Sequence, residues 1–201
     1  MGAVAQAIRP KGKIYGRAYM IFVTVGNHYQ SFDRLIKKVD DIASRLPHEI
    51  VIQRGYSGYR PQHTKHFDFV PISTAVEYIK TSDLVISHAG IGTIILCKEY
   101  GIPLIIFPRR KKYGEHGTDH QMEIAQALEE RKDVNIYMIY EEDQLEEKIV
   151  EVLKDKKKPL PTENVGKKTL IRIIREFIDK TGNDHAFSSQ DLGFKKLGIG
   201  E

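Results

Sequence analysis

Short apolar runs alternate with amphipathic stretches along most of the chain. The runs are rich in Ile, Leu and Val and have the length of buried strands, whereas the stretches repeat apolar residues with the period of a helix. The predicted strands are 19–25, 49–53, 66–70, 83–87, 102–107 and 134–139. The predicted helices are 32–45, 73–80, one that opens within 87–93 and ends near 101, 119–131 and 142–153.

This alternation predicts an α/β fold in which a Rossmann-like parallel sheet is covered by helices on both faces. Ser31 stands where its hydroxyl can cap the helix 32–45. In such sheets, ligands bind beyond the carboxyl ends of the strands, where the strand order reverses. The loops that follow 19–25, 83–87 and 102–107 are therefore expected to meet at one binding edge.

The two ends of the chain lack the alternating pattern of residues 19–153. Residues 1–18 form a basic leader without periodicity, and residues 181–201 form a polar, glycine-rich tail, so both are expected to be flexible. Residues 154–180 predict a short linker followed by an amphipathic helix over 162–180. We therefore expect one α/β domain over 19–153 with a C-terminal helix after it.

The segment Ser87-His88-Ala89-Gly90-Ile91-Gly92-Thr93 joins a predicted strand to a predicted helix. Its glycines allow the backbone to approach a ligand closely. The N–H groups at a helix start have no partner within the helix and carry partial positive charge, so an anion such as a diphosphate suits this position. A glycine-rich junction also fits a simple tight turn, but two further loops at the same edge, 24–31 and 109–121, favour the phosphate site.

Composition narrows the classes of protein that fit. The 201 residues carry a net charge of +4 and a pI of about 9.0, which favours phosphate-bearing ligands without indicating a nucleic-acid binder. The single cysteine, Cys97, excludes an internal disulfide and fits the reducing cytoplasm. No apolar run is long enough to span a bilayer, and the N-terminus lacks the apolar region of a signal peptide. Any membrane contact is thus expected to be peripheral or through a partner.

Several familiar chemistries have no motif in this chain. The dinucleotide-binding, Walker and nucleophile-elbow motifs are absent, as is C-x-x-C. His116 with His120, and His63 with His66, have spacings that a metal could use, but the usual Cys/His sets of zinc sites are missing. No D-x-D pair occurs, which argues against a metal-held sugar nucleotide. A diphosphate would then be held by backbone N–H groups, histidine and arginine, with no metal or other cofactor.

Further stretches carry a family resemblance. They are Val23-Thr24-Val25-Gly26 with Phe32-Asp33-Arg34-Leu35-Ile36, Ser82-Asp83-Leu84-Val85-Ile86-Ser87-His88-Ala89-Gly90-x-Gly92-Thr93, Glu99-Tyr100-Gly101-x-Pro103-Leu104-Ile105, and Pro108-Arg109 with Tyr113-Gly114-Glu115-His116-x-x-Asp119-His120-Gln121. Together they resemble the C-terminal domain of family 28 glycosyltransferases. The likeness is strongest to the small subunits of two-component enzymes, namely bacterial exopolysaccharide β-1,4-glycosyltransferases and the dolichol-pathway N-acetylglucosaminyltransferase. The last loop favours the bacterial branch.

The resemblance implies one half of a GT-B glycosyltransferase. This half binds a UDP-sugar donor, while a membrane-associated partner subunit binds the acceptor, which is expected to be a lipid-linked saccharide. The implied chemistry is an inverting displacement at the anomeric carbon, in which a base removes the acceptor proton and protein dipoles stabilise the departing diphosphate. The chain would then be cytoplasmic and peripheral to the membrane through its partner.

The same resemblance assigns roles to individual residues. The donor would be bound by Gly26, Asn27, Phe69, Val70, Ser87, His88, Ala89, Gly90, Gly92, Thr93, Arg109, Glu115, His116, Asp119, His120 and Gln121. His28 and His88 are the candidate catalytic residues, with a base in the partner as the alternative. Gln121 is the best candidate for hydrogen bonds to the donor sugar.

Some of these residues also have ordinary structural interpretations. Phe69 and Val70 are expected to meet the uracil through their backbone, with their side chains buried in the core. Asp119 also suits the N-cap of the helix 119–131. Arg110, with Lys111 and Lys112, is expected to face solvent or anionic lipid rather than substrate.

One position departs from the family pattern. Relatives in the dolichol and peptidoglycan branches carry a glutamate, thought to hold the ribose, three residues after the position of Thr93, where this chain has Leu96. Glu99 lies one helical turn further on and could replace it only in a suitable orientation.

Two other functions stay open, namely a non-catalytic nucleotide-binding accessory subunit and a UDP-sugar epimerase.

Overall fold

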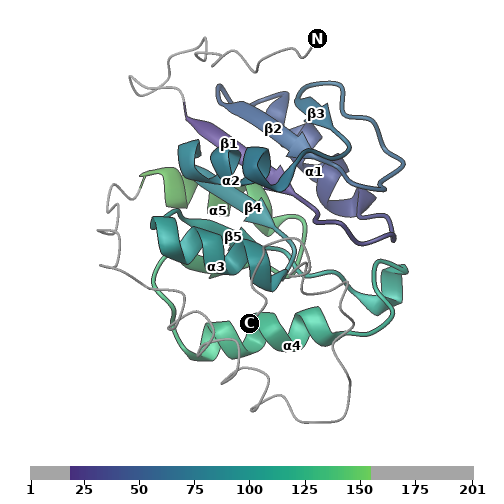
Figure 1. The fold of residues 1–201 in the computed structure, drawn as a ribbon, viewed down its shortest axis with the longest axis vertical. Coiled ribbons are helices and arrows are strands. Elements are labelled where there is room, and N and C mark those ends of the chain that lie inside the picture. The colour runs from purple at the N-terminus through teal and green to yellow at the C-terminus, as the bar shows by residue number, and fades with distance from the viewer. Residues whose placement is uncertain (1–18, 155–201) are drawn as a thin grey trace.

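Parallel strands form one sheet at the centre of the computed structural model, which describes residues 19–154 (Figure 1). The strands are β1 (Met20–Thr24), β2 (Glu49–Gln53), β3 (Lys65–Phe67), β4 (Leu84–Ser87), β5 (Leu104–Ile106) and β6 (Ile136–Met138). Their order across the sheet is β3-β2-β1-β4-β5-β6. The chain thus builds outward from β1 in one direction and then, starting with β4, in the other.

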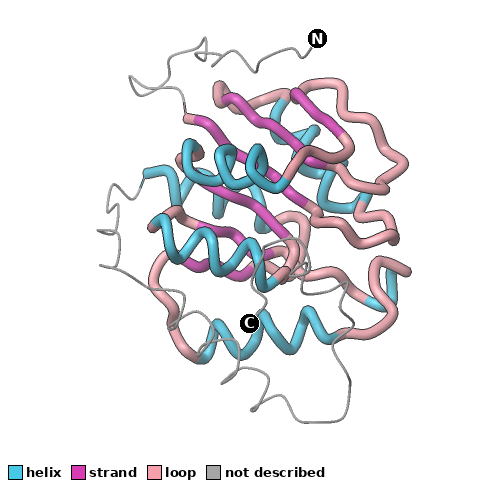
Figure 2. Tube along the Cα trace, in the orientation of Figure 1, coloured by secondary structure: helices cyan, strands magenta, loops and turns pink. Residues whose placement is uncertain are grey.

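Helices cover both faces of this sheet (Figure 2). They are α1 (Asp33–Ala43), α2 (Ile72–Thr81), α3 (Ile91–Tyr100), α4 (His120–Glu130) and α5 (Gln144–Lys154), with a short 3-10 helix η1 (Lys111–Tyr113) before α4. One apolar cluster joins α1 and α5 to one face, and a second joins α2, α3 and α4 to the other. The predicted Rossmann-like α/β fold is therefore confirmed.

The apolar runs of the sequence reflect this double cover. In β1, Ile21 and Val23 point into the cluster with α1 and α5, whereas Phe22 points into the cluster with α2, α3 and α4. Because both faces are buried, the strands need apolar residues at every position rather than at alternate ones. In β4, Leu84, Val85 and Ile86 are all fully buried for the same reason.

Helix α1 begins differently from the prediction. Its N-cap is Phe32, and no side chain caps it, so the expected cap by Ser31 is wrong. The Phe32 N–H instead donates to the Ser57 hydroxyl over 2.9 Å. A side chain from a loop distant in sequence thus hydrogen-bonds at the helix start, where a side chain next to the helix was expected to do so.

The edge strands are shorter than the sequence predicts. The predicted strand 66–70 is β3, Lys65–Phe67, and Phe69 lies after it with 43% of its surface exposed, so the expected burial of Phe69 is wrong. The predicted strand 134–139 starts only at Ile136, and Val134 is 78% exposed. An edge strand pairs on one side only, which leaves its ends free to follow the loops.

Some predictions fall outside the described residues, apart from Lys154. They are the leader 1–18, the linker and helix within 154–180, and the tail 181–201.

Candidate functional site

Two loops meet at the middle of the sheet, where the strand order reverses between β1 and β4. Thr24 ends β1 directly beside Ser87, which ends β4. The loop that starts with Val25 and Gly26 therefore lies next to the loop that starts with His88. This is the position at which open parallel sheets bind their ligands.

The imidazole of His88 lies between two glycines. A Cβ atom added to Gly26 would lie 2.5 Å from His88 Cε1, and one added to Gly90 would lie 2.4 Å from His88 Nε2. Gly26 also has a φ of +71°, which residues with side chains rarely adopt. By contrast, among the described residues, and apart from its chain neighbours and the backbone of its own helix, no atom lies within 4 Å of the Cβ position of Gly92. Gly26 and Gly90 thus make room for a side chain of the protein, whereas Gly92 faces open space.

His88 is held as a neutral ring. The Ser87 hydroxyl donates to the Thr24 carbonyl over 3.0 Å and lies 3.2 Å from His88 Nδ1. Because a hydroxyl has one proton, Ser87 accepts from Nδ1–H, which leaves the lone pair on Nε2. Burial, followed by the positive charge of Arg109, lowers the pKa of His88 to about 3. Such a ring is a weak base at neutral pH and is better suited to hydrogen bonding.

The start of α3 borders the open space beside Gly92. Gly90 is the N-cap residue, no side chain caps the helix, and its first turn contains no acidic residue. The N–H groups of Thr93 and Ile94 donate back to the Gly90 carbonyl, so those of Ile91 and Gly92 precede the first hydrogen bond of the helix. Partial positive charge at this end of the helix favours an anion.

Neighbouring loops support the β1 loop from the side of β2. Gln53, the last residue of β2, donates from Nε2 to Asn27 Oδ1 over 3.5 Å. The Cβ position of Gly55 lies 3.0 Å from the Gly26 carbonyl and 3.8 Å from Phe69. Phe69 also packs edge-on against Tyr56, which is 59% exposed. An exposed aromatic pair therefore lies beside the Gly26 loop. Val70 directly follows Phe69 in the loop after β3.

The loop after β5 closes against the loop after β1. The rings of His28 and His116 lie 4.9 Å apart, and His28 also stacks on Tyr29 at 4.7 Å. The Gln30 side chain donates to the Gly114 carbonyl over 3.0 Å. The structure thus brings the β5 loop against the β1 loop, which itself lies beside the start of α3. His28 and His116, which were predicted on different loops, are in contact.

A buried ion pair anchors the same closure. Arg34 on α1 donates to both carboxylate oxygens of Glu115, each over 2.8 Å, and both side chains are almost fully buried. Glu115 also accepts the Arg110 N–H over 3.0 Å. The carboxylate of Glu115 is therefore engaged in holding the loop in place.

Arg109 is fully buried beneath these loops. Its guanidinium donates to main-chain carbonyls of the β1 loop and the β5 loop. The main-chain N–H of Arg109 donates to Gln121 Oε1 over 3.0 Å. This bond fixes which end of the Gln121 amide faces Arg109, so the amide NH₂ group is turned elsewhere. Burial lowers the pKa of Arg109 to about 10, which leaves it protonated at neutral pH.

The start of α4 shows how the remaining predicted residues are used. Asp119 is the N-cap residue, but its carboxylate accepts the Lys111 N–H over 2.9 Å rather than a helix N–H. His120 Nδ1 lies 3.1 Å from a carboxylate oxygen of Glu123. Arg110 was expected to face solvent or lipid, and this is wrong: it is buried, and it pairs with Glu141 at 3.0 Å.

The position of the missing family glutamate is also clear. Leu96 is partly buried and packs against the core cluster of α2, α3 and α4. Glu99 lies exposed in the last turn of α3, and at 1.5 Å per residue it is about 12 Å along the axis from Ile91. Glu99 is therefore one helical turn farther from the helix start than Leu96, and its replacement of the glutamate stays a prediction.

Three residues at the site had no assigned role in the sequence analysis. Arg34, Gln30 and Gln53 make the cross-loop contacts described above. Only their position in the sequence could have indicated them. Gln53 ends β2, Gln30 lies in the loop after β1, and Arg34 lies in the first turn of the helix that follows this loop. That signal does not distinguish residues that face the site from those that face solvent.

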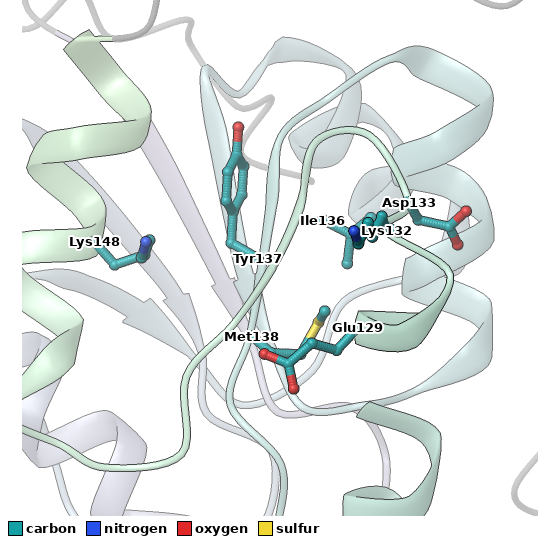
Figure 3. A pocket seen from close by; sticks show the side chains of 7 residues that line it. All are labelled: Glu129, Lys132, Asp133, Ile136, Tyr137, Met138 and Lys148. Atoms are coloured by element: carbon teal, nitrogen blue, oxygen red, sulfur yellow. The ribbon is translucent and has the colours of Figure 1, made fainter. Parts of the chain in front are cut away.

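A separate cavity lies along β6, an edge strand of the sheet (Figure 3). Charged side chains of both signs line it together with residues of β6, namely Glu129, Lys132, Asp133, Ile136, Tyr137, Met138 and Lys148. None of the predicted site residues lines this cavity, so it is distinct from the predicted site. Over residues 19–154, no group of three or more His, Cys, Asp or Glu side chains is placed to hold a metal. In the same region no helix is long and apolar enough to cross a membrane.

The fold is a Rossmann-like α/β domain, of the kind that makes up one half of a GT-B glycosyltransferase. Residues 20–177 match the glycosyltransferase family 28 C-terminal domain, and the chain belongs to this family.

Comparison with individual proteins supports this assignment. A stretch of 52 residues is 44% identical to the UDP-N-acetylglucosamine transferase subunit ALG13 of Candida albicans, covering 26% of this chain and 16% of that protein. The solution structure of ALG13 matches 81% of this chain and 98% of its own, with a TM-score of 0.51 and 20% identity. The spinosyn forosaminyltransferase SpnP matches 87% of this chain but 41% of its own, with a TM-score of 0.53 and 15% identity. The two structural matches show the shared fold, and the chain spans less than half the length of SpnP.

Proposed function

We propose that this protein is the donor-binding and catalytic subunit of an inverting UDP-sugar glycosyltransferase. It acts with a membrane-associated partner that binds a lipid-linked saccharide, in the synthesis of a polysaccharide or glycan. The observation that carries the proposal is the uncapped start of α3, which borders open space beside Gly92 at the switch point. The match to a UDP-N-acetylglucosamine transferase subunit makes N-acetylglucosamine the first sugar to test.

Each part of the donor has a suitable surface in this arrangement. The diphosphate would lie at the α3 start, with Gly92, Thr93 and the ring of His88 around it. The uracil would lie toward Phe69 and Val70, and the donor sugar toward Gln121, whose NH₂ group is free of the bond made by its oxygen to Arg109. Glu115 and the Arg109 guanidinium would support the site without touching the donor, since both are engaged with the protein.

The proposed reaction is a direct displacement. The acceptor hydroxyl oxygen attacks the anomeric carbon, the bond from that carbon to the diphosphate oxygen breaks, and UDP departs with the electron pair. A base takes the hydroxyl proton, and the helix start stabilises the charge that develops on the diphosphate. His28 is the better base candidate in this chain because the low pKa of His88 makes that ring a weak base; a base in the partner is the alternative.

The partner is proposed because the matched ALG13 protein is itself named as a subunit of a UDP-N-acetylglucosamine transferase. In a GT-B enzyme the site lies between two halves, so the acceptor would approach the exposed carboxyl edge. Lys111 and Lys112 are exposed on η1 beside this edge, and their charge suits an anionic membrane surface. These features support a cytoplasmic protein that is held at the membrane mainly through its partner.

Calorimetric titration with UDP tests the site directly. Gly92→Asp places a carboxylate in the open space at the helix start without a steric clash, and it should abolish UDP binding. Gly90→Asp is less informative because any side chain there would strike His88. Val134→Asp adds the same charge at an exposed position near the opposite edge and should bind UDP like the wild type.

The outcomes separate the parts of the proposal. UDP binding that EDTA does not change and that Gly92→Asp removes would support a metal-independent donor site. Binding that survives in Gly92→Asp would contradict the placement of the diphosphate. Absence of binding by the wild type would contradict a donor site in this chain by itself.

One observation favours an accessory role as a second candidate. The side chains of His88 and Glu115 are both engaged in contacts within the protein. A nucleotide-binding accessory subunit would bind UDP but would tolerate Gln121→Ala and His28→Ala in a transfer assay with its membrane partner. The catalytic proposal instead expects at least about tenfold loss of transfer for each substitution. An epimerase, the third possibility, would produce an altered sugar without any acceptor.

A further inference from the structure

Arg109 differs from the other two arginines near the β5 loop, Arg34 on α1 and Arg110, in the partners of its guanidinium. Arg34 and Arg110 each pair with a carboxylate, Glu115 and Glu141 respectively. Within the described residues, the hydrogen bonds from the Arg109 guanidinium go to main-chain carbonyls alone. A buried cation of this kind costs free energy that an apolar side chain would not.

The carbonyls that Arg109 gathers belong to the two loops that form the site. One terminal nitrogen donates to Val25, next to Gly26, over 2.9 Å. The other donates to Gln30 over 2.8 Å, to Ser31 over 3.2 Å and to Glu115 over 3.1 Å. One rigid guanidinium thus sets the spacing between the β1 loop and the β5 loop.

The charge of Arg109 also reaches the candidate anion site. It is the largest charge effect among those that lower the pKa of His88, and His88 lies between Gly26 and Gly90 at the α3 start. The Arg109 cation therefore acts on the groups around the diphosphate position from beneath. Phe32 shields it on another side, with its ring centre 4.6 Å from the guanidinium carbon.

We infer that Arg109 is a positioning residue that also supplies buried positive charge to the donor diphosphate, without touching it. This inference rests on the proposed UDP-sugar site and assigns Arg109 a different role in it from direct contact. The guanidinium holds the two loops at the spacing that the donor needs. Over residues 19–154 no carboxylate is hydrogen-bonded to this guanidinium, although Glu115 attracts its charge, and the remaining field offsets part of the charge of the diphosphate.

The test compares a charged ligand with a neutral one. The affinities of UDP and uridine are measured by calorimetry at low ionic strength for the wild type, Arg109→Met, Arg109→Lys and Arg110→Met. Arg109→Met should weaken UDP binding by about tenfold or more and uridine binding much less, because charge attraction acts on the diphosphate alone. Arg109→Lys keeps the charge but not the planar fork, so it should restore most of the preference for UDP over uridine.

Arg110→Met is the matched control, since it removes an adjacent buried arginine that is paired with Glu141. It should leave the preference for UDP over uridine within about threefold of the wild-type value, because the carboxylate left behind, Glu141, is 59% exposed and its charge is screened by solvent. Thermal unfolding of each variant verifies that it folds. If Arg109→Met does not fold, the Lys variant decides: a folded Arg109→Lys that loses the preference for UDP would overturn the inference.

Failure of the inference differs from failure of the proposed function. If the wild type binds UDP and Arg109→Met weakens UDP and uridine equally, Arg109 has a structural role only and the inference is wrong. If the wild type binds no UDP, the proposed donor site and this inference are both wrong.

Discussion

Gly26 and Gly114 have almost the same backbone conformation in very different surroundings. Their φ values are +71° and +68°. The Cβ position of Gly26 lies 2.5 Å from the ring of His88, whereas the Cβ position of Gly114 has no other described atom within 4 Å. At the scale of the residue, this pair separates the cost of backbone conformation from the cost of displacing His88.

Alanine substitution at both glycines tests this separation. Gly114→Ala should lower the free energy of unfolding by about 1 kcal/mol, the cost of a left-handed conformation for a residue with a Cβ. Gly26→Ala should lower it by about 2–4 kcal/mol, because the methyl group also forces the His88 ring to move. Urea unfolding of both variants gives the two values. Equal losses would mean that His88 can move at little cost.

Helix α1 shows how one element connects the core to the loops. Its apolar face contributes Leu35 and Ile36 to the core, and its other side holds Asp40, which is almost fully buried. The Asp40 carboxylate accepts the hydroxyl of Tyr59 and the N–H groups of Gln62 and His63, at 2.8–2.9 Å. The long loop between β2 and β3 is thereby fastened to the helix.

The Asp40 contacts predict a pH-dependent contribution to stability. Burial acts to raise the pKa of Asp40, but the hydrogen bonds from Gln62, His63 and Tyr59 outweigh it and lower the pKa below its ordinary value of 3.8. Because the folded pKa is the lower one, the contribution is present above about pH 4 and is lost as the pH falls through the folded pKa.

Asp40→Asn tests this contribution at two pH values. At pH 7 the variant should be less stable than the wild type by about 1–3 kcal/mol, since the amide replaces one acceptor oxygen with a donor. At pH 3 the difference should be smaller, because the unfolded wild-type chain then binds a proton at Asp40 more readily than the folded protein, whose pKa at this carboxyl is lower. Urea unfolding at both pH values measures it, and a difference that stayed constant would contradict the assignment.

At the scale of the whole molecule, the strand order places the most deeply buried strands beneath the site. β1 and β4 lie at the centre of the sheet, and their carboxyl ends carry Gly26 and His88. β3 and β6 are the two edges. The loops of the site are therefore supported by the part of the sheet that has neighbours on every side.

The same substitution in a central and an edge strand tests this arrangement. Ile86→Ala in β4 should lower the free energy of unfolding by about 3–5 kcal/mol, because rigid neighbours cannot fill the cavity. Ile136→Ala in β6 should cost about 2 kcal/mol, since an edge strand can relax toward the gap. Urea unfolding compares them, and a larger loss at Ile136 would show that the edge contributes more to the stability of the fold than its position implies.

Much of this architecture was predictable from local patterns. The strand and helix order, the end of α3 near Gly101 and the meeting of the predicted loops at one edge of the sheet all follow from apolar runs and glycine junctions. The prediction was poorest for capping and for charged residues: Ser57 rather than Ser31 meets the start of α1, and Arg110 is buried. Sequence spacing cannot indicate such contacts, because their partners come from other loops.

The sequence by itself determined the class of fold, the family and the three loops that carry the site, because buried strands and strand-to-helix junctions are written in neighbouring residues. Only the tertiary structure decided that Gly90 makes room for His88 while Gly92 faces open space. It also decided that the Arg109 guanidinium donates hydrogen bonds to main-chain carbonyls, one of them that of Val25, 84 residues away in the sequence. A residue's role in a site depends on what packs against it, and these partners meet only when the sheet has brought distant loops together.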